Sequence, residues 1–414
     1  MKYFAGLGGL AVLTWMQALK RVGVPTLNGG IFRSQVARTT RRDAEIEGFD
    51  QVHIYLDAAF ASSFFLAGLI VVSQKFHGTL THDGSDGVQK IHDAPTPRIG
   101  GIAVLLGACL AAIMLPAEAR RLWWMICLCA LPAFLSGAIE DITKKVSAKW
   151  RLVATVLAGL IFCLVSGYHI ERADIPGLDF LLGYPAFGIA LSVLAIGGIA
   201  NSLNIIDGVN GLASGSAIIV LSCFAILAAR SDDVALLAIC LLMIGAIAGF
   251  FVLNFPAGKL FFGDAGAYTT GFVLAVIGII LPVRNPEYSP MIAVLALSYP
   301  WIETLVSIRR RAKRDGTNPG EADRLHLHSL VYRSRAKRIA ETIGMPRMRN
   351  PLTSILLWPL SLIACTITVI APGDSVVLGC GVGVVFLIYL LIYRRVALLS
   401  RLRRALIGQF THRA

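Results

Sequence analysis

The chain has 414 residues, of which 56% are hydrophobic and 15% charged, and its formal net charge is +13. Soluble globular proteins carry roughly 25% charged residues, so this composition excludes an ordinary soluble enzyme and favours a protein surrounded by lipid. The basic excess does not indicate nucleic-acid binding. Most of it lies in loops on one side of the predicted membrane spans, where it reports topology and contact with anionic lipid.

Residues 1–54 differ from the rest, because a short glycine-bearing apolar stretch is followed there by mixed charge. An extra helix or a signal-like segment is one interpretation, and we favour a dispensable N-terminal extension. We expect a single polytopic membrane domain over residues 55–396. A basic cytoplasmic tail should then follow over 397–414.

From residue 56 onward, apolar runs of about the length needed to cross a bilayer recur, roughly 17–25 residues each. Lipid leaves no partner for unpaired backbone amides, so these runs must be helices. The sequence predicts an all-α membrane protein with about 11 transmembrane helices. The spans are 56–74, 99–117, 122–139, 152–168, 181–200, 211–229, 234–253, 267–283, 290–308, 353–371 and 376–393.

Lysine and arginine concentrate in every second gap between these spans, and the gaps between them hold few charged residues. Because cytoplasmic loops carry the positive excess, the basic gaps and the tail are expected in the cytoplasm. The same gaps hold the carboxylates, amides and histidines. The pattern predicts catalytic loops that face the cytoplasm.

Asp264 lies between two glycines in Phe261–Gly266, at the cytoplasmic end of a predicted span. Its carboxylate could reach a cation there while the backbone approaches closely; the alternative is a simple helix cap. Glu140 and Asp141 end another span and are followed by lysines. A Mg²⁺ ion and phosphate-binding lysines would account for both signs of charge, and the alternative is a solvated loop.

Asn201, Asn204 and Asp207 recur at spacings of three, which places them on one face of a helical turn. Such a face can bind a nucleotide, a sugar or hydrated magnesium; the alternative is a polar turn. Further along the chain, His326 and His328 follow Arg324 and would suit an anion such as a diphosphate. Lys90 and Arg98, in a proline-bearing segment, are candidate phosphate contacts.

Five segments, taken in order, resemble the polyprenyl-phosphate N-acetylhexosamine-1-phosphate transferases. They are TPRIGG, the acidic pair before KK, NSLNIIDGVNGLASG, KLFFGDAGAY and DRLHLH. That superfamily, glycosyltransferase family 4, includes the phospho-N-acetylmuramoyl-pentapeptide-transferases. The resemblance implies transfer of a sugar 1-phosphate from a UDP-N-acetylhexosamine to undecaprenyl phosphate, with release of UMP. It further implies a need for Mg²⁺, or Mn²⁺ in its place, and a place in the bacterial inner membrane.

The resemblance also implies the site residues. Asp264, Asp207 and Asp141 match positions that handle the metal, and with Glu140 they form the catalytic set. Substrate-binding positions are matched by Lys90, Asn204, Asn210, Lys149, Arg324, His326 and His328.

Three positions depart from the family pattern: Glu140 replaces an aspartate, Asn210 replaces the second aspartate of DGxDG, and Ser329 replaces a third histidine. They favour a GlcNAc-type branch that starts O-antigen or capsule units. They also motivate one alternative, an impaired relative that acts as a scaffold. A transporter is the other alternative, although the spans are almost free of charge, with Glu303 as the exception. A homodimer is left open.

Overall fold

The computed structural model describes residues 52–81, 96–312 and 325–411, all within one compact unit, Phe49–Ala414. Of the predicted extension 1–54, all but the last three residues lie outside these ranges, and those three belong to the first described helix. The predicted boundary between 396 and 397 lies inside a continuous helix. Lys90 and Arg324 are outside the described residues.

The described chain is helical, with no β-strand in the ranges given above, and the predicted all-α class is confirmed. Its α-helices are α3 (Val52–Thr81), α4 (Gly100–Ala111), α5 (Ala117–Thr143), α6 (Ala148–Ser166), α7 (Pro176–Leu182), α8 (Pro185–Ile206), α9 (Leu212–Arg230), α10 (Val234–Asn254), α11 (Gly263–Arg284), α12 (Met291–Ala296), α13 (Ser298–Ala312), α14 (Leu327–Val331), α15 (Lys337–Thr342), α16 (Arg349–Ile370) and α17 (Ser375–Thr411). Short 3₁₀ turns cover Ala112–Met114 and Pro346–Met348, and a π-helical turn covers Tyr332–Ala336.

Nine helices of the described part are long and apolar enough to cross a membrane, so the chain is a multi-pass membrane protein. Two predicted spans differ from the rest. The span at 99–117 is the short apolar helix Gly100–Met114, whose 15 residues reach about 22 Å at roughly 1.5 Å per residue. The span at 290–308 is broken into α12 and α13 between Ala296 and Ser298. Pro300 follows that break and has no N–H to continue a helical ladder.

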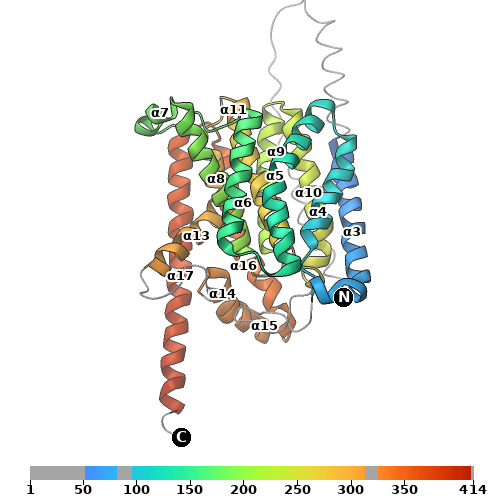
Figure 1. Cartoon of the computed structure of the whole chain (residues 1–414). Coiled ribbons are helices and arrows are strands. Elements are labelled where there is room, and N and C mark those ends of the chain that lie inside the picture. Colours follow the sequence, from blue (N-terminus) through green and yellow to red (C-terminus); the bar gives the residue numbers. More distant parts are fainter. Residues whose placement is uncertain (1–51, 82–95, 313–324, 412–414) are drawn as a thin grey trace, which may run out of the picture. The chain divides into compact units, whose positions relative to one another are not determined.

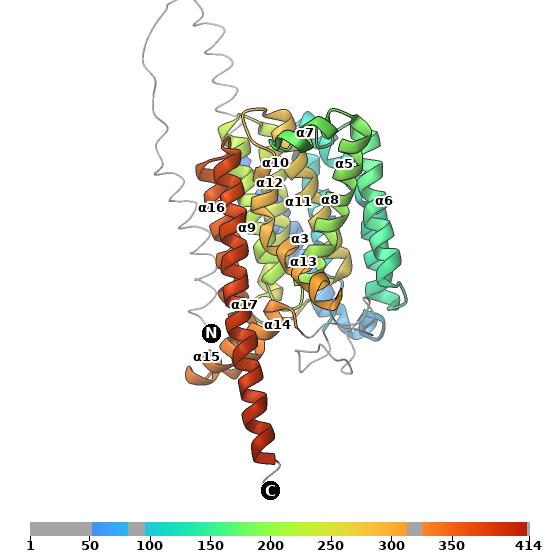
Figure 2. The same ribbon diagram turned by 90° about the vertical axis from the view of Figure 1, so that its left-hand side faces the viewer.

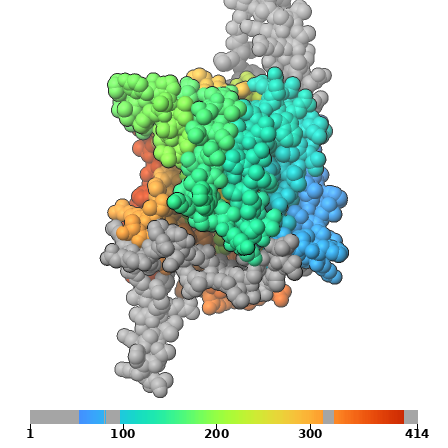
Figure 3. Space-filling view, in the orientation of Figure 1, coloured from blue at the N-terminus to red at the C-terminus, as the bar shows by residue number. Residues whose placement is uncertain are grey.

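Helix α11 is the centre of the bundle, because every residue from Gly263 to Pro282 is buried. It packs against α4, α5, α8 and α9, while α6 packs on α5 and α8, and α10 packs on α3 and α9. Figures 1 and 2 show these helices around α11 from two sides. In the space-filling view of Figure 3, α5 to α8 cover the face toward the viewer.

Glycines let α4 and α5 approach the backbone of α11. A Cβ atom on Gly101 would lie 2.1 Å from the backbone nitrogen of Gly266, and one on Gly137 would lie 2.5 Å from that of Ala265. Neither distance is compatible with a side chain. Small residues allow this close contact between membrane helices, and here the contacts gather at the start of α11.

The two ends of the bundle differ in what their polar groups do. At one end, Arg284 donates to Asp233 at 2.7 Å and to Glu118 at 2.8 Å, which links α11, α10 and α5. Helix α7 lies at this end, at the top of Figure 1. The start of α11 lies at the opposite end, toward α14 and α15 at the bottom of the same view. The few charged residues of the first end therefore hold helices together.

Candidate functional site

The site is built on the first turn of α11. Gly263 has φ +77°, a left-handed conformation that glycine adopts without strain. A Cβ atom at this position would lie 1.9 Å from the carbonyl oxygen of Arg98 and 2.6 Å from Oδ2 of Asp141. Glycine is therefore required here, and it places the next residue, Asp264, with its side chain 7% exposed.

Asp141, near the end of α5, caps α11 from a different helix. Its Oδ1 accepts the backbone N–H of Asp264 at 2.9 Å, and its Oδ2 accepts that of Ala265 at 3.0 Å. The first N–H groups of a helix have no partner within the helix, and their partial positive charge favours a carboxylate. The acidic pair is divided in function, because Glu140 instead accepts the N–H of Val146 at 2.7 Å and closes the α5–α6 loop.

The carboxylate of Asp264 has three side-chain partners from three other segments. Asn204, at the end of α8, donates to Oδ1 at 2.9 Å. Arg98, just before α4, approaches the same oxygen at 3.4 Å. Arg151, in the first turn of α6, forms an ion pair with Oδ2. Two guanidinium groups thus converge on one buried carboxylate.

Arg151 is the site residue that sequence reasoning missed. The sequence assigns Lys149, two positions earlier, to the substrate and gives Arg151 no role. In the structure Lys149 is exposed and makes no hydrogen bond or ion pair with the described residues. No local signal in the sequence separates the two residues, because both lie in the first turn of α6.

The two polar residues that end α8 differ in their surroundings. Asn204 is fixed on both sides, because its Oδ1 also accepts the hydroxyl of Tyr268 at 3.3 Å. Asp207 makes no side-chain hydrogen bond or ion pair within the described residues. Although it is only half-buried, the surrounding protein desolvates its carboxyl and raises its pKa well above the usual range. Asn201 does not join the site, since it donates to Thr155 at 2.8 Å.

Asn210 lies three residues after Asp207 and holds the loop that follows α8. Its backbone N–H donates to Asn350 at 2.7 Å, and its Nδ2 donates to the carbonyl of Pro256 at 3.3 Å. Nearby, Asn254 accepts the N–H of Gly211 at 2.7 Å and donates to the carbonyl of Leu260 at 2.8 Å. These amides connect the Asp207–Gly211 loop to the segment that leads into α11.

His326 and His328 are buried at the start of α14, with exposed fractions of 6% and 4%. Their rings stack with centroids 5.4 Å apart. A Cβ atom on Gly208 would lie 2.4 Å from Nε2 of His328, so this ring rests on the backbone directly after Asp207. The structure therefore brings the histidine segment to the loop at the end of α8, and the substrate role of the two histidines stays a prediction.

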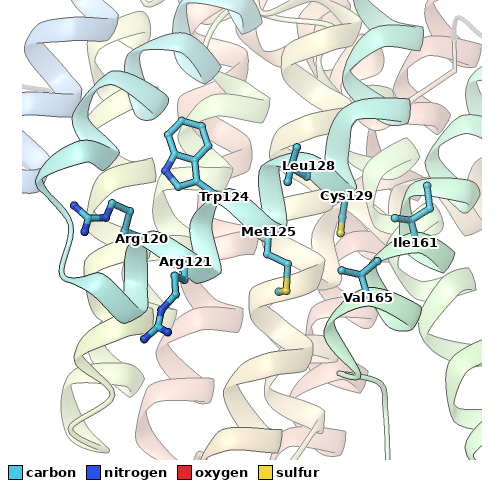
Figure 4. A pocket seen from close by; sticks show the side chains of 8 residues that line it. All are labelled: Arg120, Arg121, Trp124, Met125, Leu128, Cys129, Ile161 and Val165. Atoms are coloured by element: carbon cyan, nitrogen blue, oxygen red, sulfur yellow. The ribbon is translucent and has the colours of Figure 1, made fainter.

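A cavity of about 600 Å³ lies elsewhere, between the start of α5 and the end of α6. Figure 4 shows its lining, which is apolar except for Arg120 and Arg121. It contains none of the carboxylates, amides or histidines described above. Its position near the opposite ends of α5 and α6 separates it from the cluster around Asp264.

The comparisons with known proteins identify the family. A model of glycosyl transferase family 4 matches residues 123–282, the part of the chain that supplies Asp141, Asn204, Asp207 and Asp264. The phospho-N-acetylmuramoyl-pentapeptide-transferase of Bacillus thuringiensis (strain Al Hakam) is 30% identical over 222 residues, which cover 50% of this chain and 67% of that protein. The chain belongs to glycosyl transferase family 4.

Two further relatives carry a different name. A probable undecaprenyl-phosphate N-acetylglucosaminyl 1-phosphate transferase of Bacillus subtilis (strain 168) is 30% identical over 246 residues, covering 58% of this chain and 66% of the relative. The undecaprenyl-phosphate alpha-N-acetylglucosaminyl 1-phosphate transferase of Yersinia pestis is 28% identical over 255 residues, covering 59% and 68%. The chain thus spans about two thirds of each relative. The matches include relatives named as N-acetylglucosaminyl 1-phosphate transferases and as phospho-N-acetylmuramoyl-pentapeptide-transferases.

The oxygen donors in this family 4 protein suit magnesium. Mg²⁺ is usually held by one or two carboxylates together with substrate phosphates and water. The described residues contain no group of three or more histidine, cysteine or acidic side chains arranged around one point. Asp264 and Asp207 are two carboxylates of the kind that Mg²⁺ uses, and their assignment to a metal stays a prediction. Asp141 already uses both oxygens to cap α11, and its assignment to the metal stays a prediction.

Proposed function

We propose that this protein transfers an N-acetylhexosamine 1-phosphate from a UDP-sugar to undecaprenyl phosphate and releases UMP. The observation that carries the proposal is the carboxylate of Asp264, which is buried at a helix start and paired with Arg98, Arg151 and Asn204. This set combines an oxygen ligand for a cation with two cations for an anion. Membership of family 4 supports the same reaction, as do the names of its relatives.

The reaction moves one phosphoryl group between two oxygens. An oxygen of the lipid phosphate forms a bond to the sugar-side phosphorus, and the bond from that phosphorus to the bridging oxygen breaks, so the bridging oxygen leaves with UMP. A phosphate monoester has its second pKa near 6, so the attacking oxygen is largely ionised at neutral pH. A strong general base is therefore unnecessary.

The chain's own residues position the charges for this transfer. Arg98 and Arg151 can pair with phosphate oxygens, since the planar guanidinium offers paired donors to such groups. Asn204 holds the Asp264 carboxylate in place, and Asp207 provides a second carboxylate nearby. Asp264 and Asp207 would hold Mg²⁺, or Mn²⁺ in its place, and such an ion neutralises charge on transferring phosphates.

We further propose that the site faces the cytoplasm of a bacterial inner membrane. Most of the basic loop residues and the described site residues are at the same end of the helices, which is the arrangement that positive-inside topology favours. A UDP-sugar is a soluble cytoplasmic metabolite, so a site on this side meets its donor directly. The preference for a GlcNAc-type donor and the formation of a homodimer stay predictions from the sequence.

The test is turnover by the purified protein in detergent. UMP release should require both undecaprenyl phosphate and a UDP-N-acetylhexosamine, and a panel of such donors would name the sugar. Asp264→Asn should remove turnover. Thermal unfolding of the variant checks that it still folds. Absence of UMP release with every donor, from wild-type protein that unfolds cooperatively, would reject the transferase and leave the scaffold interpretation.

Exchange of labelled UMP into UDP-sugar without the lipid separates two routes. Direct attack by the lipid phosphate gives no such exchange. A covalent phosphosugar carried on an aspartate would give it. We expect none.

A further inference from the structure

Glu303 is a buried carboxylate that the reaction described above does not use. It lies on α13, the helix that follows the break after Ala296, and is 1% exposed. A buried charge is costly unless it is paired and hydrogen-bonded. An apolar residue would fill this position with a smaller cost in desolvation free energy. The partners of Glu303 therefore indicate the role of the carboxylate.

Its partners are in the histidine segment. Oε1 of Glu303 accepts the backbone N–H of Leu327 at 2.6 Å. The same oxygen lies 3.3 Å from Nδ1 of His326. One carboxylate oxygen therefore holds both the first histidine ring and the peptide between the two histidines, across 23 residues of sequence.

The contact extends to the site by two further steps. The ring of His326 stacks on that of His328 with an interplanar angle of 6°. His328 in turn rests against Gly208, the residue after Asp207. A displacement of His326 would consequently move the ring that contacts the Asp207–Gly208 backbone.

The chemistry of the pair also follows from the carboxylate. The carboxylate beside Nδ1 of His326 favours the observed orientation of that ring over a flipped one, because its negative charge attracts the polar edge of the imidazole. An uncharged group in place of Glu303 keeps the acceptor for Leu327 and loses this effect on His326.

We propose that Glu303 is a positioning residue for the donor substrate: it fixes His326, and through it His328, so that the pair binds the diphosphate of the sugar nucleotide. The inference rests on the proposed function. It assigns no direct contact between Glu303 and the substrate. It predicts that Glu303 affects donor binding and leaves binding of the lipid acceptor unchanged.

Glu303→Gln tests this directly, because the amide oxygen can still accept the Leu327 N–H. Thr304→Val is the matched control on the same helix, since the Thr304 hydroxyl donates only to the carbonyl of Pro300 within α13, at 3.1 Å. We expect Glu303→Gln to raise KM for the UDP-sugar about tenfold, the loss of one charge-assisted contact. KM for undecaprenyl phosphate and the Tm should match those of Thr304→Val.

Calorimetric titration with UDP adds a readout that needs no turnover. Weaker UDP binding by Glu303→Gln than by Thr304→Val supports the inference, even if the wild type releases no UMP and the proposed reaction is rejected. The further loss of UDP affinity when His326→Gln is added to Glu303→Gln should be smaller than the loss that His326→Gln causes in the wild type, because the two residues act as a unit. If the donor KM and UDP affinity of Glu303→Gln equal those of the control, the inference is wrong while the transferase stands.

Discussion

The carboxylate of Asp141 accepts the backbone N–H of Asp264 at 2.9 Å, so the end of α5 fixes the residue at the start of α11. The two residues are 123 positions apart in the chain. Their contact joins a structural task, capping a buried helix, to a chemical one, the placement of the central carboxylate. It also separates the roles of the acidic residues, which the sequence presents as equivalent.

Asp141→Asn should damage both tasks. The amide turns an N–H group toward one of the two helix N–H donors, and loss of an N-terminal cap costs about 1–2 kcal/mol. We expect a lower Tm and a fall in kcat on the order of 100-fold, since small displacements of reacting groups have effects of that size. Glu118→Gln, on the same helix but 61% exposed, is the control, and an equal loss of kcat there would contradict the assignment.

Arg151→Ala should reduce turnover on the order of 100-fold, because a preorganised charge is removed from the site. Arg151→Lys should restore part of the activity through its charge. Lys337→Ala is the control, since Lys337 forms a surface pair with Glu341 at 3.6 Å and such pairs contribute about 0–1 kcal/mol. Steady-state UMP release measures all three variants. Wild-type turnover by Arg151→Ala would remove this residue from the site.

Gly263→Ala should prevent the native packing of α4, α5 and α11. The left-handed backbone alone costs about 1–3 kcal/mol for another residue, and the added Cβ meets Arg98 and Asp141. Gly198→Ala is the matched control, because a Cβ there has no neighbour within 4 Å and alanine favours a helix by up to ~1 kcal/mol. Thermal unfolding in detergent should show a clear decrease for the first variant and no decrease for the second.

Chelation of divalent cations should abolish UMP release, and Mg²⁺ should restore it. Asp207→Asn is expected to raise the Mg²⁺ concentration for half-maximal activity about tenfold or more, as the loss of one carboxylate weakens a hard-cation site. Asp174→Asn, at the other end of the bundle, is the control for removing a carboxylate. An unchanged Mg²⁺ requirement in Asp207→Asn would exclude Asp207 from the metal site.

Single cysteines can establish which side the site faces. Lys149→Cys lies in the first turn of α6 and Glu171→Cys in the loop beyond its other end, and both positions are exposed. A membrane-impermeant maleimide should label position 149 only in inside-out vesicles and position 171 only in right-side-out vesicles. Protein without an introduced cysteine gives the background labelling of the native cysteines. The reverse pattern would invert the proposed topology.

The architecture was predictable from the sequence because lipid imposes a simple rule on each span separately. Apolar length alone located nine helices, since a helix in lipid satisfies its backbone internally. The same rule failed to indicate the break between α12 and α13, because the mean hydropathy of the span does not respond to a single residue such as Pro300. That break depends on local backbone conformation at Leu297, which hydropathy does not report.

The site was predictable only in part. Asp264 and Asn204 stand out in their motifs and lie together in the structure. Arg151 does not stand out among its basic neighbours, and its ion pair spans 113 positions of sequence. Glu303 appeared merely as an exception in an apolar span. In both cases the informative fact is a contact between distant helices, and no local pattern in a single sequence records such a contact.

The glycine contacts at the start of α11 have a consequence for how this protein can change. Gly101, Gly137 and Gly263 admit no side chain, so the contacts that hold α4 and α5 against the start of α11 involve peptide groups, which are the same whatever amino acids surround them. Substitutions can alter the α8 loop and the histidine segment while these contacts stay constant. Efforts to change the donor of the proposed reaction should therefore begin at the α8 loop and the histidine segment.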